Sequence, residues 1–207
     1  MSGCWGGVEW LAKELLRLGM IRFGRFKLAS GLESPYYVDL RRLYSYPQVA
    51  RRVAEGVAGL VTRAGGEAVA GVATAGIPLA AYVAALKSMP MGYVRLEVKG
   101  HGTGSRVEGD LKGLKVVVID DVVTTGSSVL KAVRALRGEG VEVVGAAAVI
   151  DREQGARRAL EAEGVKLLTL AKATEVFEAL RREGLLSEDV YDEVVRYVRS
   201  FGREDFK

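Results

Sequence analysis

Apolar residues follow two spacings along the chain, and these spacings predict the order of strands and helices. Short apolar runs without polar alternation, such as residues 116–119, are typical of strands buried on both faces of a sheet. Longer segments with apolar residues three and four positions apart, such as 126–138, are typical of amphipathic helices. From residue 67 onward the two kinds of segment alternate. This alternation predicts a parallel sheet with helices on both faces.

The predicted elements can be placed by residue number. Five strands are expected at residues 67–72, 91–97, 115–120, 141–150 and 165–170. Helices are expected at 77–88, 126–138, 153–163 and 173–183, with further helices at 8–18, 47–63 and 188–199. Residues 21–42 have a strand-like spacing around a Ser30-Gly31 turn. We therefore expect an α/β fold with a central parallel five-stranded sheet flanked by helices and a small N-terminal β-rich hood at about 20–45.

The segment of about residues 98–110 departs from this alternation. It contains four glycines and no apolar periodicity. Such loops inside a compact domain are usually functional lids or disordered segments, and a plain surface loop is the alternative. Arg95, Lys99 and His101 favour a mobile catalytic lid, because cationic or titratable groups at its start can meet a diphosphate.

Length, charge and cysteine content narrow the class of protein. The chain has 207 residues, so we expect one domain, residues 1–207, with a full core. The net charge is +4 with basic and acidic residues interspersed, which an anionic small molecule explains as well as nucleic acid does. Cys4 is the only cysteine, which fits a reducing cytoplasm. No apolar run approaches the roughly 20 residues that span a bilayer, so we expect no membrane segment.

The densest candidate chemistry follows the third predicted strand. Asp120 and Asp121 end its apolar run, and hydroxyl residues with Gly126 then open a helix. Backbone N–H groups at a helix start, joined by hydroxyls, suit a phosphate monoester, and glycine permits a close approach of the backbone. Ionised carboxylates accept hydrogen bonds, so the aspartates suit the hydroxyls of a ribose, directly or through Mg²⁺. Ribose 5-phosphate satisfies both parts.

Simpler interpretations exist for each half of this stretch. An ordinary helix start and a pair of solvated aspartates would explain either half alone. A Walker A loop is excluded because no Gly-Lys-Ser/Thr follows, and no Gly-x-Gly-x-x-Gly follows the strand either. The whole stretch 116–128 resembles the signature of the type I phosphoribosyltransferases, enzymes that bind 5-phosphoribosyl 1-diphosphate (PRPP).

Within that family the chain is similar to the orotate phosphoribosyltransferases over nearly its whole length. Segment 26–39 resembles their cap over the base, and 71–78 resembles their diphosphate-binding turn. Segment 95–104 resembles their mobile catalytic loop, and 151–154 resembles the segment that recognises orotate. The resemblance implies transfer of ribose 5-phosphate from PRPP to orotate, which gives orotidine 5′-monophosphate and diphosphate in pyrimidine biosynthesis.

The resemblance also implies roles for individual residues. Lys99 and His101 are expected to be catalytic, because they neutralise the leaving diphosphate. Thr124 and Arg152 are expected to contact orotate, since a planar guanidinium binds a carboxylate or carbonyl edge bidentately. Tyr37 is either a residue that lies against the base or a core tyrosine. The PRPP site is expected to comprise Arg95, Lys99, His101, Asp120, Asp121, Val122, Val123, Thr124, Thr125, Gly126, Ser127 and Ser128.

Further expectations concern the metal, the assembly and the backbone. Mg²⁺ is expected to be carried by PRPP near Asp120 and Asp121, with no direct protein ligand. A homodimer is expected, in which segment 98–110 completes the neighbouring active site. A non-proline cis peptide bond is expected near Ala73-Thr74. Many bacterial members carry lysine at three positions where this chain has Ala29, Ala75 and Leu96. Lys27 is a candidate substitute for the lysine missing at Ala29.

Two other functions are alternatives. A purine phosphoribosyltransferase usually builds its base pocket from a C-terminal hood, so segments 26–39 and 151–154 favour orotate over purines. A PRPP-binding transcriptional regulator of the same fold often loses the loop lysine or histidine, whereas Lys99 and His101 are present here. The chain also has no spare basic segment for DNA. We therefore expect a cytoplasmic enzyme with no nucleic-acid partner.

Overall fold

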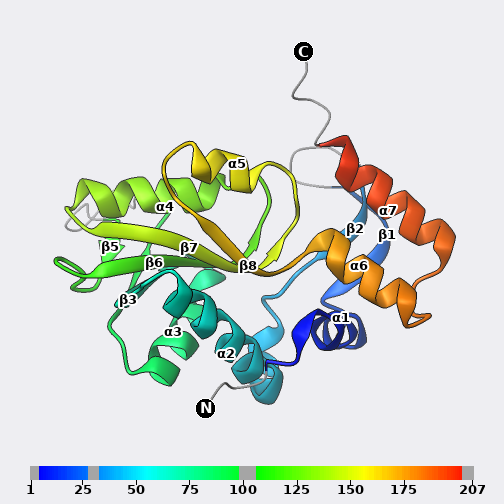
Figure 1. The fold of residues 1–207 in the computed structure, drawn as a ribbon, viewed down its shortest axis with the longest axis horizontal. Coiled ribbons are helices and arrows are strands. Elements are labelled where there is room, and N and C mark those ends of the chain that lie inside the picture. The colour runs from blue at the N-terminus through cyan, green and yellow to red at the C-terminus, as the bar shows by residue number, and fades with distance from the viewer. Residues whose placement is uncertain (1–4, 28–32, 98–105, 202–207) are drawn as a thin grey trace.

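A mainly parallel sheet organises the fold (Figure 1). The computed structural model describes residues 5–27, 33–97 and 106–201. In this sheet the strand order is β5-β4-β3-β6-β7-β8, and the edge strand β5 is antiparallel to β4 while the other neighbours are parallel. The strands are β3 (Ala68–Val72), β4 (Met91–Val94), β5 (Val107–Glu108), β6 (Lys115–Val123), β7 (Glu142–Asp151) and β8 (Leu167–Lys172).

Four helices cover the two faces of this sheet: α2 (Pro47–Arg63), α3 (Gly76–Lys87), α4 (Ser127–Gly138) and α5 (Ala156–Glu161). In Figure 1, α4 and α5 lie above the sheet, and α2 and α3 lie below it. Successive side chains of a strand point to opposite faces. Val116 and Val118 of β6 therefore enter one apolar cluster, and Val117 and Ile119 enter the other. This is why β6 is apolar without alternation.

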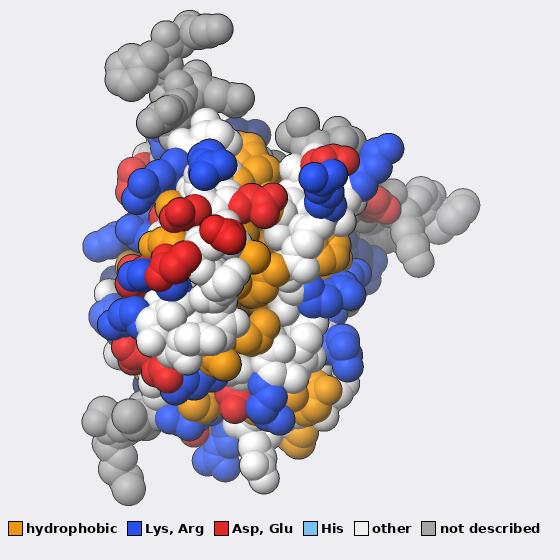
Figure 2. All heavy atoms as spheres, turned by 90° about the vertical axis from the view of Figure 1, so that its right-hand side faces the viewer, with side chains coloured by type: hydrophobic (Ala, Val, Ile, Leu, Met, Phe, Trp, Pro, Cys, Tyr) orange, Lys and Arg blue, Asp and Glu red, His pale blue; other side chains and the backbone are white. Residues whose placement is uncertain are grey.

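The hood lies on the right of Figure 1 and contains the C-terminal end of the described chain. The observed hood is larger than the predicted one at 20–45: besides β1 (Ile21–Lys27) and β2 (Glu33–Val38) it contains three helices that pack with them, namely α1 (Gly7–Arg17), α6 (Ala173–Arg182) and α7 (Glu188–Ser200). The antiparallel pair of β1 and β2 confirms the predicted β-rich hood. Figure 2 faces this side of the molecule and shows acidic and basic side chains intermixed on it.

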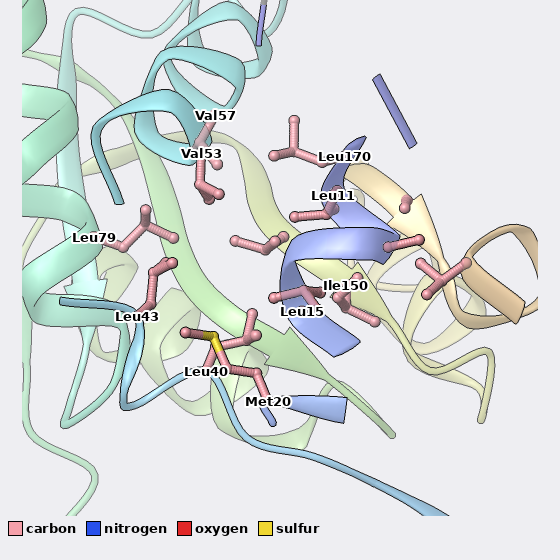
Figure 3. Close-up of a cluster of buried hydrophobic side chains, with 14 of the residues drawn as sticks. Leu11, Leu15, Met20, Leu40, Leu43, Val53, Val57, Leu79, Ile150 and Leu170 are labelled. Atoms are coloured by element: carbon pink, nitrogen blue, oxygen red, sulfur yellow. The ribbon is translucent and has the colours of Figure 1, made fainter. Parts of the chain in front are cut away.

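One apolar cluster connects the hood to the sheet (Figure 3). Leu11 and Leu15 of α1 are one helical turn apart and both are fully buried. They lie in the same cluster as Val53 of α2, Ile150 of β7 and Leu170 of β8. The hood therefore shares its core with the sheet, and this fixes it beside the carboxyl end of β7.

The five predicted parallel strands are confirmed, but the predicted C-terminal end of the second strand, 91–97, was wrong. β4 ends at Val94 rather than at residue 97. There the amide of Arg95 donates a hydrogen bond of 2.8 Å to the carbonyl oxygen of Arg106, which joins the start of β5 to the end of β4. β5 is a sixth strand inside the segment 98–110, where the sequence predicts no regular structure. Its two residues are too few to produce an apolar period.

Two other boundaries differ because of local backbone contacts. β6 continues to Val123 rather than to residue 120, because Val122 and Val123 still pair with β7. α5 begins at Ala156 rather than at residue 153. Glu153 and Gly155 have φ values of 58° and 99°, which a right-handed helix does not allow.

Some predictions concern parts of the chain that the structure does not describe. Cys4, Ala29, the Ser30-Gly31 turn, Lys99 and His101 lie outside the described residues. Among the helices that are described, none is long and apolar enough to cross a membrane.

Candidate active site

The candidate site lies where β3, β4, β6 and β7 end. In a parallel sheet these carboxyl ends share one edge, which is where ligands bind in such folds. The register aligns the ends of neighbouring strands. Gly71 of β3 pairs with Ile119 of β6, and Val123 of β6 pairs with Asp151 of β7. The turns that follow these strands are therefore neighbours in space.

Two hollows lie along this edge. The smaller has a volume of about 180 Å³ and is lined by Asp120 and residues 122–129. The larger has a volume of about 610 Å³ and is lined by Ala73, Thr74 and residues 95–97. The first gathers the predicted phosphate loop. The second joins the predicted diphosphate turn to the start of the predicted catalytic loop, although these segments are about twenty residues apart in the sequence.

The smaller hollow is built on the start of α4. Gly126 precedes this helix with a φ of 81°, and its carbonyl oxygen accepts a hydrogen bond of 2.9 Å from the amide of Leu130. A Cβ at Gly126 would approach the Cα of Ala156 to 3.2 Å, so both the turn and the packing favour glycine here. N–H groups in the first turn of a helix have no partner within the helix. Together with the hydroxyls of residues 124–128 they suit a phosphate.

Asp120 and Asp121 form an acidic pair beside this hollow. Asp120 is 8% exposed, and its carboxylate accepts a hydrogen bond of 2.9 Å from the amide of Asp121. Burial, and then the charge of Asp121, raises the pKa of Asp120 well above its ordinary value. Burial also raises the pKa of Asp121. Ligands that donate hydrogen bonds to these carboxylates would favour the ionised forms and oppose this effect.

Asp120→Asn is expected to stabilise the ligand-free protein at neutral pH. A raised carboxyl pKa contributes stability below about pH 3.8, and this contribution is lost as the pH rises through the pKa of the folded state. The amide of asparagine avoids that loss and can still accept the hydrogen bond from Asp121. The free energy of unfolding in urea should therefore exceed that of the wild type at pH 7, and the difference should shrink at about pH 3.5.

The control for this experiment is Asp192→Asn, which removes a negative charge from an exposed position on α7. A stabilisation of equal size in the control would mean that the effect comes from net charge. A variant Asp120→Asn that is less stable than the wild type at pH 7 would contradict the direction of the pKa shift.

The turn after β3 approaches the backbone of β6 closely. The peptide bond between Ala73 and Thr74 is cis, which confirms the prediction made for this turn. Gly76 is the first residue of α3, and a Cβ at this position would clash with the carbonyl oxygen of Ile119. Because backbone cannot move away as a flexible side chain can, glycine at residue 76 keeps the turn beside Asp120.

Gly76→Ala is expected to lower the free energy of unfolding by about 3 kcal/mol, because the added methyl group must displace backbone atoms. The matched control is Gly138→Ala at the end of α4, where an added Cβ meets no atom within 4 Å. We expect the control to change stability by no more than about 1 kcal/mol. Denaturant unfolding measures both variants. If Gly76→Ala were as stable as the control, the turn would be able to move away from β6 to make room for the methyl group.

Arg95 reaches the larger hollow from the end of β4. Its guanidinium forms a salt bridge of 2.6 Å with Glu108 of β5, and its carbon lies 6.0 Å from the ring centre of Tyr93. Arg95 also lines the same hollow as Ala73 and Thr74. The structure therefore brings Arg95 to the predicted diphosphate turn, as the resemblance implies.

Arg152 follows β7, on the other side of the phosphate loop from the diphosphate turn. Its amide donates a hydrogen bond of 2.8 Å to the carbonyl oxygen of Val123, so it lies beside Thr124. Its Nε donates a hydrogen bond of 3.3 Å to the hydroxyl of Tyr36. Its Nη2 is buried, and no described group accepts a hydrogen bond from it. Buried donors are nearly always paired, so this nitrogen has capacity for an acceptor from outside the described residues, such as a bound ligand or water.

Sequence reasoning missed Tyr36, which contacts Arg152. Tyr37 was singled out instead, but its ring centre lies 5.6 Å from that of Phe26. Neighbouring residues of a strand point to opposite faces. Ser34 and Tyr36 are the buried positions of β2, but Glu-Ser-Pro-Tyr-Tyr-Val has no apolar alternation in the sequence that would have singled out Tyr36. The contact of Tyr37 with the base stays a prediction.

Sequence reasoning also missed Tyr44, which lies in a short 3₁₀ helix, Leu43–Ser45. Its hydroxyl donates a hydrogen bond of 3.4 Å to the carbonyl oxygen of Ala75 in the diphosphate turn. Burial, and then the charges of Asp121 and Asp120, raises the pKa of Tyr44. The tyrosine is therefore neutral and lies within the field of the acidic pair. No motif marks it, because its three-residue helix has no periodicity.

Known proteins resemble this chain over most of its length. Residues 41–178 match the model of the phosphoribosyl transferase domain. The chain is 43% identical to an orotate phosphoribosyltransferase of Pyrobaculum calidifontis over 188 residues. The aligned residues are 90% of this chain and 97% of that relative. The chain belongs to the orotate phosphoribosyltransferase family. Members are pentosyltransferases, so the predicted enzyme class is confirmed.

Solved structures of orotate phosphoribosyltransferases share this fold. The crystal structure of the enzyme from Aeropyrum pernix is 44% identical with a TM-score of 0.73, and the match covers 86% of this chain and 99% of that chain. The Mycobacterium tuberculosis enzyme in complex with PRPP is 31% identical with a TM-score of 0.68. That match covers 82% of this chain and 98% of that chain. These similarities confirm the type I phosphoribosyltransferase fold. They support the orotate phosphoribosyltransferase function over the purine and regulator alternatives.

Proposed function

We propose that the chain transfers ribose 5-phosphate from PRPP to orotate, which yields orotidine 5′-monophosphate and diphosphate. One observation carries the proposal: three binding features follow one another along a single edge of the sheet. They are a hydroxyl-rich helix start, a carboxyl pair of which Asp120 is buried, and a half-buried guanidinium with one buried, unpaired nitrogen. In that order they suit a phosphate, the hydroxyls of a ribose and a planar acidic base.

PRPP binds with its 5-phosphate in the smaller hollow, where N–H groups and hydroxyls at the start of α4 donate hydrogen bonds to it. The ribose hydroxyls then reach the carboxylates that precede this loop. Hydrogen bonds from these hydroxyls stabilise the ionised carboxylates and offset their burial. The residues that bind PRPP are Arg95, Lys99, His101, Asp120, Asp121, Val122, Val123, Thr124, Thr125, Gly126, Ser127 and Ser128.

Orotate binds on the β7 side of PRPP, beside Thr124 and Arg152. The guanidinium offers parallel N–H groups to a carboxylate or carbonyl edge, and a charge-assisted pair of this kind is strong and directional. The hydrogen bond between the amide of Arg152 and the carbonyl oxygen of Val123 keeps this base site next to the phosphate loop. The base and the ribose are thereby held side by side, which a direct transfer requires.

The reaction breaks the bond between C1 of the ribose and the diphosphate oxygen, and it forms a bond between C1 and a nitrogen of the base. The proton that this nitrogen carried is released to the departing diphosphate or to water. Negative charge grows on the departing diphosphate while the ribosyl centre becomes cationic. Arg95, Lys99 and His101 stabilise the departing charge, and this lowers the barrier. Closure of the part of segment 98–110 that precedes β5 excludes water, which would otherwise hydrolyse PRPP.

Mg²⁺ fits this site as a companion of PRPP. Within the described ranges, no three His, Cys, Asp or Glu side chains are grouped to hold a metal ion. Asp120 and Asp121 nevertheless offer two carboxylates beside the phosphate loop. They would lie near Mg²⁺ that phosphate oxygens of PRPP and water carry into the site, without ligating it directly. When bound with PRPP it supplies positive charge to the diphosphate.

The active unit is a cytoplasmic homodimer of single-domain subunits, in which segment 98–110 of one subunit completes the site of the other. The apolar cluster shared by the hood and the sheet supports a single domain over residues 1–207. The family resemblance supports the dimer. PRPP, orotate and a second copy of the chain are the partners, and neither nucleic acid nor membrane is required.

The test is an absorbance assay that follows the loss of orotate in a mixture of protein, orotate, PRPP and Mg²⁺. We expect turnover that requires all four components. Reactions without PRPP or without Mg²⁺ are the controls, because either omission should stop the reaction. Binding of PRPP without turnover of orotate would keep the fold assignment and contradict the proposed function.

A further inference from the structure

Tyr36 is fixed in place by the two C-terminal helices of the hood. Its side chain is fully buried. Its ring centre lies 4.8 Å from that of Phe177 on α6 and 6.0 Å from that of Tyr197 on α7, both in edge-to-face geometry. Such contacts restrict the rotation and tilt of a ring. The hydroxyl of Tyr36 therefore has a fixed position at the end of β7.

This hydroxyl occupies one edge of the Arg152 guanidinium. It accepts a hydrogen bond of 3.3 Å from Nε, and the guanidinium carbon lies 4.8 Å from the ring centre of Tyr36. A guanidinium has five N–H donors in a planar fork, so a bond at Nε leaves the terminal edge with Nη1 and Nη2 for another acceptor. Nη2 is buried and finds no acceptor among the described groups. Arg152 as a whole is half-buried, so its terminal edge combines a buried nitrogen that has donor capacity to spare with access for a ligand.

We propose that Tyr36 is a positioning residue for the base: its hydroxyl holds Arg152 so that the terminal edge of the guanidinium faces orotate. The inference rests on the proposed function. An arginine side chain loses rotamer freedom when it binds a ligand, and fixing it beforehand lowers that cost. Tyr36 acts through Arg152 and does not touch the reacting atoms. Its loss should therefore weaken the binding of orotate and leave the binding of PRPP unchanged.

Tyr36→Phe tests this directly, because it removes the hydroxyl and keeps the ring that packs on Phe177. We expect the KM for orotate to rise about tenfold, as is typical for loss of a hydrogen bond to a charged group. The KM for PRPP and kcat should stay within about twofold of the wild type. The matched control is Tyr197→Phe, which removes a neighbouring hydroxyl that is buried without a described partner. It should leave all three parameters unchanged.

A double-mutant cycle with Arg152→Ala separates positioning from general structure. If the hydroxyl acts through the guanidinium, Tyr36→Phe should have no further effect on the KM for orotate once Arg152 is absent. A full tenfold effect in that background would overturn the proposal. An unchanged KM for orotate in Tyr36→Phe would also overturn it. So would a rise in that KM that is accompanied by a loss of PRPP affinity and a lower melting temperature.

The same assay distinguishes failure of this inference from failure of the proposed function. Turnover of orotate by the wild type, with an unchanged KM for orotate in Tyr36→Phe, overturns the positioning role alone. Absence of orotate turnover by the wild type overturns both.

Discussion

Replacing Lys99 by alanine is expected to lower kcat by about two to three orders of magnitude, with a much smaller change in PRPP affinity. Negative charge on the diphosphate grows as its bond to the ribose breaks. A cation at the leaving group therefore stabilises the transition state more than the ground state. PRPP keeps its other contacts, namely the phosphate loop, the carboxyl pair and Arg95. The loss should consequently appear in turnover rather than in binding.

Two measurements decide this prediction: kcat with saturating substrates, and the dissociation constant of PRPP by titration calorimetry. Lys112→Ala is the matched control, because it removes an exposed lysine outside the proposed site. Its kcat should equal that of the wild type. Equal turnover in Lys99→Ala would remove Lys99 from the chemistry, and a parallel loss of PRPP affinity and turnover would make it a general binding residue.

Arg152→Ala is expected to raise the KM for orotate by about two orders of magnitude, because a charge-assisted bidentate contact is lost. The effect on the KM for PRPP should be small, since the phosphate loop and the carboxyl pair stay intact. Arg152→Lys should recover only part of the loss. A lysine ammonium keeps the charge but cannot present two parallel donors to a planar edge.

Arg134→Ala provides the comparison for this pair of variants. Arg134 of α4 forms an exposed salt bridge with Glu163 and is not one of the proposed base-binding residues, and surface pairs contribute little. Steady-state kinetics with each substrate varied in turn measure all three variants. An Arg152→Ala enzyme with the wild-type KM for orotate would place the base elsewhere.

The elements of the sheet were predictable from the sequence because their causes are local. The apolar run 116–119 has to be buried on both faces, and both clusters of the core receive it. The start of α4 was also predictable, since Gly126 and its hydroxyl neighbours form a local motif. The boundaries of β4 and α5 were not, because they depend on the Arg95–Arg106 hydrogen bond and on positive φ values after β7.

Contacts between distant segments were the least predictable part of the site. The motif around Arg152 pointed to base recognition, but the partner of its guanidinium is Tyr36, 116 residues earlier. Tyr44 and Ala75 likewise meet only because α2 and α3 pack on the same face of the sheet. Such pairs depend on the packing of whole elements, which no local pattern encodes.

The central claim is that this site joins ribose 5-phosphate to orotate, and the most direct measurement is product identification under competition. The protein is incubated with PRPP, Mg²⁺ and an equimolar mixture of orotate, adenine, hypoxanthine and guanine, and the nucleotides formed are separated and identified by mass. We predict orotidine 5′-monophosphate as the product, with release of an equal amount of diphosphate. A purine nucleotide in its place, or no nucleotide at all, would contradict the claim.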